Sequence, residues 1–191
     1  MLKVILTSIF ILFLFLAPAA FAQDEDMAAQ QQAWMDYMTP GPMHEMMAKS
    51  VGDWKTTIKL WMDPSGEPMV SEGTSKVEMI LGGRYLKETS NSMVMGMQMD
   101  GMNLTGYDNL TKEFTSVWID NMGTGTSVVK GTYDEATRTI TLHGSMVDPM
   151  SGSEMNIKET LQIIDDNHHV LEMFVDQDGM EVKSMEVDYT R

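Results

Sequence analysis

Residues 53–62 read Asp-Trp-Lys-Thr-Thr-Ile-Lys-Leu-Trp-Met, and this stretch decides the fold class. Its bulky side chains at Trp54, Ile58 and Leu60 alternate with lysine and threonine. Successive side chains of an extended chain point to opposite faces, so a period of two is typical of a strand with one buried face. The stretch therefore predicts a half-buried β-strand.

The rest of the chain repeats this pattern, with turn sequences such as Asp63-Pro64-Ser65-Gly66 between the runs. The further predicted strands cover residues 69–81, 84–91, 93–100, 103–107, 113–120, 124–133, 138–147, 154–164, 169–176 and 180–189. Their connections suit hairpins and leave no room for crossover helices, which indicates an up-and-down antiparallel sheet. Because a long twisted sheet usually closes, we predict a mainly β, lipocalin-like barrel of about 8–10 strands with a short N-terminal helical segment. An immunoglobulin-like sandwich is the alternative.

The first 22 residues have the layout of a cleavable secretory signal. Lys3 precedes an uncharged apolar run at residues 4–16, and Ala20-Phe21-Ala22 offers small residues for cleavage before Gln23. The run is too short to span a membrane comfortably, and a retained membrane anchor is the alternative. We expect an exported protein, periplasmic or secreted, with no membrane span after cleavage.

The sequence predicts three parts: a signal peptide at 1–22, a flexible polar arm at 23–42 that contains a short helix, and a lipocalin-like barrel domain at 43–191. The barrel domain begins with a second helix over residues 43–50, in which Met43, Met46 and Met47 share one face.

The mature chain is strongly acidic and contains no cysteine. Only Lys3 of the 13 basic residues leaves with the signal, so 12 remain against 28 acidic residues, a net charge of −16 with histidine neutral. Such a surface repels phosphate backbones and argues against nucleic-acid binding. The missing cysteines exclude disulfides, thiolate metal sites, lipid attachment to cysteine and cysteine nucleophiles.

Several short motifs follow one another along the predicted barrel. They include Val51-Gly52-Asp53-Trp54-Lys55, Leu81-Gly82-Gly83-Arg84-Tyr85-Leu86, Gly106-Tyr107-Asp108-Asn109, Trp118-Ile119-Asp120-Asn121 and Gly131-Thr132-Tyr133-Asp134. The first resembles the Gly-x-Trp opening of lipocalin-like barrels. As an ordered set over about residues 43–189, the motifs resemble a family of secreted bacterial proteins known as a domain of unknown function. The resemblance implies a lipocalin-like barrel and assigns no catalytic residue.

Methionine is unusually frequent, at 22 of 191 residues. Every second residue from Met93 to Met99 is methionine, so a strand there places the thioethers of Met93, Met95, Met97 and Met99 on one face. Flexible thioethers suit a cavity or lid that accepts apolar ligands. They are also soft ligands for Cu(I) or Ag(I), which makes copper, held with help from His44, the alternative cofactor. A third use is as a reversible oxidant sink.

Two groups of side chains are candidate ligand contacts inside the barrel. Glu159 shares a strand face with apolar neighbours, so either it points inside or the strand is bulged there. A buried carboxylate needs a partner, and we expect Arg84, either as a structural ion pair or as a pair that orients a ligand. Trp118 and Asp120 share a face of another strand. They form either a ligand-orienting wall or a core plug and a turn cap.

These features favour a small-ligand-binding protein. We expect an apolar or amphipathic ligand in a methionine-rich cavity, contacted by Trp54, Arg84, Trp118, Asp120 and Glu159. No cofactor and no catalytic residue are predicted, because the chain has no nucleophile elbow, phosphate loop, dinucleotide fingerprint or zinc-protease motif. An enzyme that uses Asp120 or Glu159 as base is a further alternative, and it predicts that one carboxylate titrates abnormally.

Overall fold

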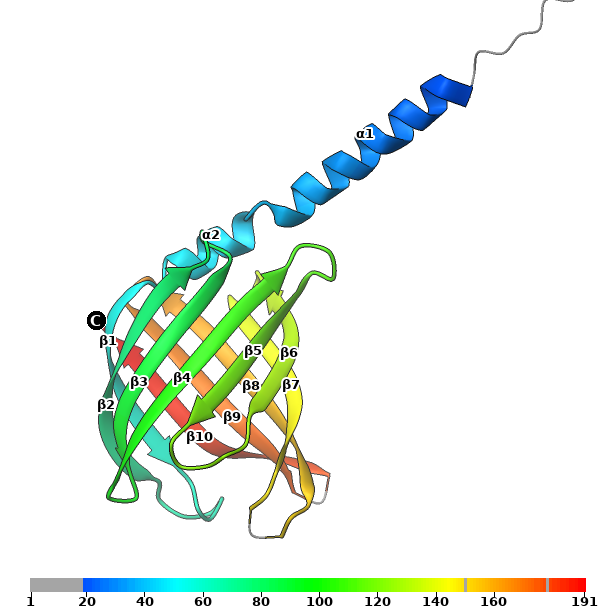
Figure 1. Cartoon of the computed structure of the whole chain (residues 1–191). Coiled ribbons are helices and arrows are strands. Elements are labelled where there is room, and N and C mark those ends of the chain that lie inside the picture. Colours follow the sequence, from blue (N-terminus) through cyan, green and yellow to red (C-terminus); the bar gives the residue numbers. More distant parts are fainter. Residues whose placement is uncertain (1–18, 150, 178) are drawn as a thin grey trace, which may run out of the picture. The chain divides into compact units, whose positions relative to one another are not determined.

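The computed structural model describes residues 19–149, 151–177 and 179–191 (Figure 1). The chain forms two compact units, which divide between Met38 and Thr39. The first unit contains helix α1 (Ala19–Met38), and the second contains helix α2 and ten β-strands. Residues 1–18, most of the predicted signal peptide, lie outside the described residues, so cleavage and export stay predictions. In the described part of the chain, no helix is both long and apolar enough to cross a membrane.

Helix α1 is longer than the short helix predicted within residues 23–42. The predicted flexible arm is therefore helical as far as Met38, two residues before Pro40. A helix commonly ends before a proline, because the proline ring disfavours helical backbone at the preceding residue. Trp34 and Tyr37 form an edge-to-face pair on α1, with ring centroids 6.0 Å apart.

Helix α2 (Pro42–Ala48) confirms the helix predicted over residues 43–50. Pro42 opens the first turn, where its missing N–H has no intrahelical partner to lose. The Gly41 N–H donates to His44 Nδ1 at 3.1 Å, which satisfies a donor at the N-terminus of the helix. On the next turn Met47 is buried, with 4% of its surface exposed.

Ten strands follow α2 and close into one barrel, as predicted (Figure 1). Each strand is antiparallel to both neighbours, and β1 closes the sheet by pairing with β10. The strands are β1 (Gly52–Leu60), β2 (Met69–Ile80), β3 (Tyr85–Val94), β4 (Met97–Asp108), β5 (Glu113–Asp120), β6 (Ser127–Asp134), β7 (Thr139–Val147), β8 (Glu154–Asp165), β9 (His168–Gln177) and β10 (Met180–Thr190).

The prediction was wrong about the boundaries of β3 and β4. It ended one strand at Asn91 and began another at Met93, but β3 runs through to Val94 and pairs with β4 over its whole length. The chain reverses at Met95 and Gly96, with φ angles of 53° and 79°. Two successive positive φ angles characterise the type I′ turn, whose twist matches that of a hairpin.

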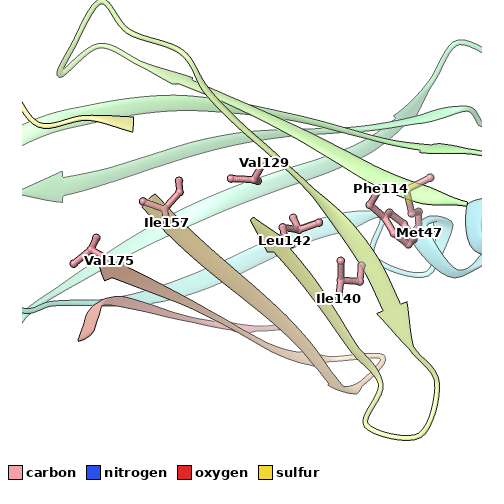
Figure 2. Packing of buried hydrophobic residues seen from close by; sticks show 7 residues of the cluster. All are labelled: Met47, Phe114, Val129, Ile140, Leu142, Ile157 and Val175. Carbon is pink, nitrogen blue, oxygen red and sulfur yellow. The ribbon is translucent and has the colours of Figure 1, made fainter. Parts of the chain in front are cut away.

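The buried apolar core lies along the interior of β5 to β9 and reaches α2 (Figure 2). Phe114 is fully buried, and Met47 of α2 belongs to the same cluster. The other members are Val129, Ile140, Leu142, Ile157 and Val175. We call the end of the barrel next to α2 the α2 end, and the opposite end, where the Met95-Gly96 turn lies, the hairpin end.

Candidate ligand-binding cavity

A cavity of about 90 Å³ lies inside the barrel towards the α2 end. One part of its wall is apolar, with side chains from β2, β3, β7, β8 and β9. These are Val77, Leu86, Ile140, Leu142, Leu161 and Leu171. They occupy alternate strand positions, so the period of two that defines the sheet also creates this wall.

The rest of the wall is polar, and Glu88 on β3 is its centre. Glu88 Oε1 accepts hydrogen bonds from Ser75 Oγ at 2.7 Å, Ser90 Oγ at 3.0 Å and the Tyr189 hydroxyl at 3.2 Å. These donors come from β2, β3 and β10, so one carboxylate oxygen joins three strands. All three donors are uncharged.

A second polar group lines the cavity from β4 and β5. Asn103 Nδ2 donates to Ser116 Oγ at 2.7 Å, and Thr105 Oγ1 donates to Asn103 Oδ1 at 2.7 Å. Ser116 is buried, with 5% of its surface exposed. These bonds fix the side chains, since a polar group left unpaired in the interior costs stability.

Glu159 faces the same cavity from β8, which is the inward of the two predicted alternatives, and its strand has no bulge at that point. It pairs in regular register with Leu142 on β7 and Met173 on β9. Burial raises the pKa of its carboxyl group to about 6. Burial also raises the pKa of the Tyr189 hydroxyl well above its ordinary value, and the nearby Glu88 and Glu159 charges act in the same direction. Both carboxylates therefore act electrostatically on one hydroxyl group.

Trp54 and His169 form the part of the wall next to α2. Their ring centroids are 4.7 Å apart, and Trp54 Nε1 donates to the Ser50 carbonyl at 2.9 Å. The Arg191 guanidinium lies 4.3 Å from the centroid of the Trp54 ring. Burial lowers the pKa of His169, and the Arg191 charge lowers it further. His169 is therefore a neutral imidazole near pH 7.

Residues 39–191, which hold α2 and all ten strands, match the family described as Protein of unknown function (DUF1579). The chain belongs to the DUF1579 family. No curated protein matches the chain. The match confirms the predicted membership of a domain-of-unknown-function family, whereas secretion of the DUF1579 domain stays a prediction.

Of the predicted contacts, Trp54 and Glu159 line the cavity of the DUF1579 domain. Arg84 lies elsewhere, on the turn between β2 and β3, where its exposed guanidinium donates to the carbonyls of Leu81 and Gly82. The expected pairing of Arg84 with Glu159 is therefore wrong. A chain reversal presents its side chains at the rim of the barrel, and the strand alternation used for Glu159 does not extend to such a residue.

Trp118 and Asp120 lie on β5 nearer the hairpin end, away from the cavity wall. Trp118 Nε1 donates to Asp120 Oδ2 at 2.6 Å, and the Met122 N–H donates to Asp120 Oδ1 at 2.9 Å. The ring of Trp118 covers Gly101, where an added Cβ would lie 2.3 Å from it. Of the two alternatives for this pair, the geometry favours the core plug and the turn cap.

The four methionines at 93–99 do not share a face. In the hairpin Met93 pairs with Gln98 and Ser92 pairs with Met99. Paired residues point to the same side of the sheet, so the odd-numbered residues of β3 point to one side and those of β4 point to the other. Met95 lies in the turn itself. His44 is at the α2 end, about 30 Å away along the ten residues of β3. A metal site that combines His44 with all four methionines is therefore not formed.

The cavity is also not rich in methionine, contrary to the prediction. Among the described residues that line it, none is methionine. Met46, Met47 and Met79 pack against the apolar core instead.

Sequence reasoning missed Glu88, His169 and Tyr189. The signal available for them was the alternation of side chains along each strand, β3 for Glu88, β9 for His169 and β10 for Tyr189. Polar residues occupy both faces of these strands, so the sequence did not show which face points inward.

Proposed function

We propose that the DUF1579 domain, exported as its N-terminus predicts, binds a small amphipathic organic molecule in the cavity at the α2 end. One observation carries the proposal: the cavity joins an apolar wall to polar groups that converge from several strands. Small-molecule sites have this composition, because apolar walls supply affinity and a few polar groups fix orientation.

The volume sets the size of the ligand. A cavity of about 90 Å³ is smaller than the roughly 150 Å³ apolar cavity that accepts benzene in another protein. The proposed ligand therefore has about four or five heavy atoms. The upper limit on binding energy per heavy atom, about 1.5 kcal/mol, gives such a ligand a dissociation constant no tighter than roughly micromolar.

Trp54 provides a direct readout, since it lines the cavity and its indole N–H donates to Ser50, which lines it too. The chain has four tryptophans, so the indole signals in a ¹H–¹⁵N spectrum are easily separated. We expect short alcohols and amines to shift the Trp54 signal with saturation and to leave the Trp34 signal on α1 unchanged.

A pair of variants locates the binding. Leu161→Phe adds volume at the cavity wall, whereas Gln162→Phe adds the same ring one residue along β8 on the exposed face. Leu161→Phe should abolish the Trp54 response and Gln162→Phe should preserve it. If both variants keep the wild-type response, or if no compound in the series shifts Trp54, binding in this cavity is refuted.

Soft-metal binding is a second candidate, supported by the exposure of Met93, Met95 and Met97 at one hairpin. We propose that Ag(I), as a stable substitute for Cu(I), binds there without His44. Titration with Ag(I) should shift the methionine methyl signals of this hairpin. Replacing all three with leucine should abolish the saturable Ag(I) binding measured by titration calorimetry, and unchanged methyl signals on titration of the wild type would exclude the site.

A further inference from the structure

We infer that the head group selected by this cavity is a small organic cation, such as a primary ammonium group, placed between Glu88 and Glu159. The inference rests on the proposed ligand-binding function and adds the chemical class of the ligand. The cavity wall holds both carboxylates, and none of its described residues is lysine or arginine.

Two basic residues lie beside the cavity, Arg191 and His169, and neither neutralises these carboxylates. Arg191 lies over Trp54 outside the cavity wall, and its guanidinium donates to the carbonyls of Lys49, Val51 and Asp166. His169 is in the wall, but burial and the Arg191 charge lower its pKa and keep it neutral. The cavity therefore presents negative charge without a protein cation.

The hydrogen bonds of the two carboxylates also favour a cationic head group. Glu88 Oε1 receives uncharged donors only, and no described residue donates a hydrogen bond to the Glu159 carboxylate. A buried carboxylate without a partner is costly, and a charged donor forms the strongest hydrogen bond to it. A primary ammonium group brings three donors and one positive charge, which matches two carboxylates better than a hydroxyl group does.

Other ligand classes fit less well. A fatty acid would bring a third negative charge into a cavity that already holds two carboxylates. A metal ion needs several converging ligands, and in the described part of the chain no three His, Asp or Glu side chains are close enough to hold one. The apolar wall formed by Leu86, Leu161 and Leu171 would instead contact a short alkyl chain attached to the ammonium group.

The test uses three compounds of equal length: butylamine, 1-butanol and butyrate. We follow the Trp54 indole signal of the full-length protein near neutral pH. Butylammonium should bind at least about tenfold more tightly than 1-butanol, because a charged hydrogen bond exceeds a neutral one by about one power of ten in affinity. Butyrate should bind more weakly than either.

Charge-removing variants then assign the contact. Glu159→Gln should weaken butylammonium about tenfold and leave 1-butanol within about twofold, because it removes the charge and keeps the shape. Glu88→Gln is an independent second variant that retains an acceptor for Ser75 and Tyr189. Glu113→Gln, at an exposed position on β5, is the control for net charge and should change neither affinity.

The possible results separate the two proposals. If 1-butanol binds as tightly as butylammonium, or if both cavity variants leave the preference unchanged, the cationic head group is wrong and the binding cavity stands. If butyrate is preferred, the inference is also overturned. If none of the three compounds shifts Trp54 at millimolar concentration, both this inference and the proposed function fail.

Discussion

Both ends of the barrel are formed by hairpin connections, but the α2 end has large side chains packed inside it, whereas the hairpin end has methionines exposed on its loops. At the α2 end, Phe114 is fully buried, and Trp54 and Met47 are 2% and 4% exposed. At the hairpin end, Met62 and Met95 are 68% and 60% exposed. The α2 end also contains the cavity, whereas the hairpin end contains the loops in which methionine is most conspicuous.

The most abundant residue type is therefore not the one that forms the candidate binding site. Methionine dominates the sequence, yet the described residues that line the cavity include none. The cavity depends on single polar residues at ordinary strand positions, such as Glu88 and Glu159, which no bulk property of the sequence reveals. Burial gives Glu159 its chemistry, because the scarcity of water around its carboxyl group disfavours the charged form and raises its pKa.

The largest expected effect concerns the core of the α2 end. Phe114→Ala removes a fully buried ring and leaves a void, which should lower the free energy of unfolding by about 3–5 kcal/mol. Urea denaturation measures this change. Leu110→Ala is the matched control on the neighbouring β4–β5 turn, where the side chain is 78% exposed, and should stay within about 0.5 kcal/mol of the wild type. Equal effects for the two variants would show that the buried ring of Phe114 contributes no more to stability than an exposed side chain at the same end.

The next effect comes from Glu159. Its pKa is 4.5 as an ordinary glutamate and about 6 in the folded protein. Between these values the folded chain holds a proton that the unfolded chain has lost, so the free energy of unfolding falls as the pH rises. The difference of about 1.5 pKa units corresponds to a penalty of up to roughly 2 kcal/mol above pH 6.

Glu159→Gln should remove this penalty. We expect the variant to exceed the wild type by up to about 2 kcal/mol near pH 7.5 and to match it near pH 3.5, since wild-type Glu159 is largely protonated there in both the folded and the unfolded chain. Urea denaturation at both pH values measures the difference between the two proteins, in which other titrating groups cancel. A difference that does not change with pH would show that burial does not perturb this carboxyl group.

Much of the fold could be predicted from the sequence because it depends on local rules. The period of two at Trp54, Ile58 and Leu60 and the short turns predicted the antiparallel barrel, and strand alternation placed Glu159 inside. The same rule failed at the run from Met93 to Met99. There a two-residue turn interrupts the strand, and a reversal exchanges the faces of odd and even residues.

The cavity was less predictable, because it depends on which residues from distant strands meet. Glu88 and Tyr189 are 101 residues apart in the sequence and share a hydrogen bond. Arg84 was proposed as the partner of Glu159 on charge alone, but its position on a turn keeps it at the rim. Contacts of this kind depend on the register between strands and on how the barrel closes, and neither can be predicted from one local stretch of sequence.

A smaller effect is expected from the polar part of the cavity wall. Tyr189→Phe removes the hydroxyl that donates to Glu88 and keeps the ring that packs on Trp54. The loss of one hydrogen bond should lower the free energy of unfolding by about 1 kcal/mol. Tyr85→Phe, at a position that is 40% exposed, is the control and should have no measurable effect. Urea denaturation of both variants would contradict the assignment if Tyr85→Phe proved the more damaging.

The smallest effect on stability is expected at the hairpin end, and oxidation tests it without any substitution. Met62, Met95 and Met180 are at least 60% exposed, whereas Met47 is 4% exposed. Limited hydrogen peroxide should convert the exposed methionines to sulfoxides first and change the free energy of unfolding by less than about 0.5 kcal/mol. Peptide mass spectrometry over time gives the order of modification.

Oxidation of Met47 should come last and coincide with loss of structure, because a polar sulfoxide there would disrupt the core formed with Phe114. Since Met47 lies on α2, its rate also measures how often that helix leaves the barrel. If Met47 were oxidised as fast as Met95 while the fold persisted, the α2 end would be open in solution. The contrast between the two ends would then describe packing alone, and peroxide reaching Met47 would mark a route by which a ligand enters the cavity.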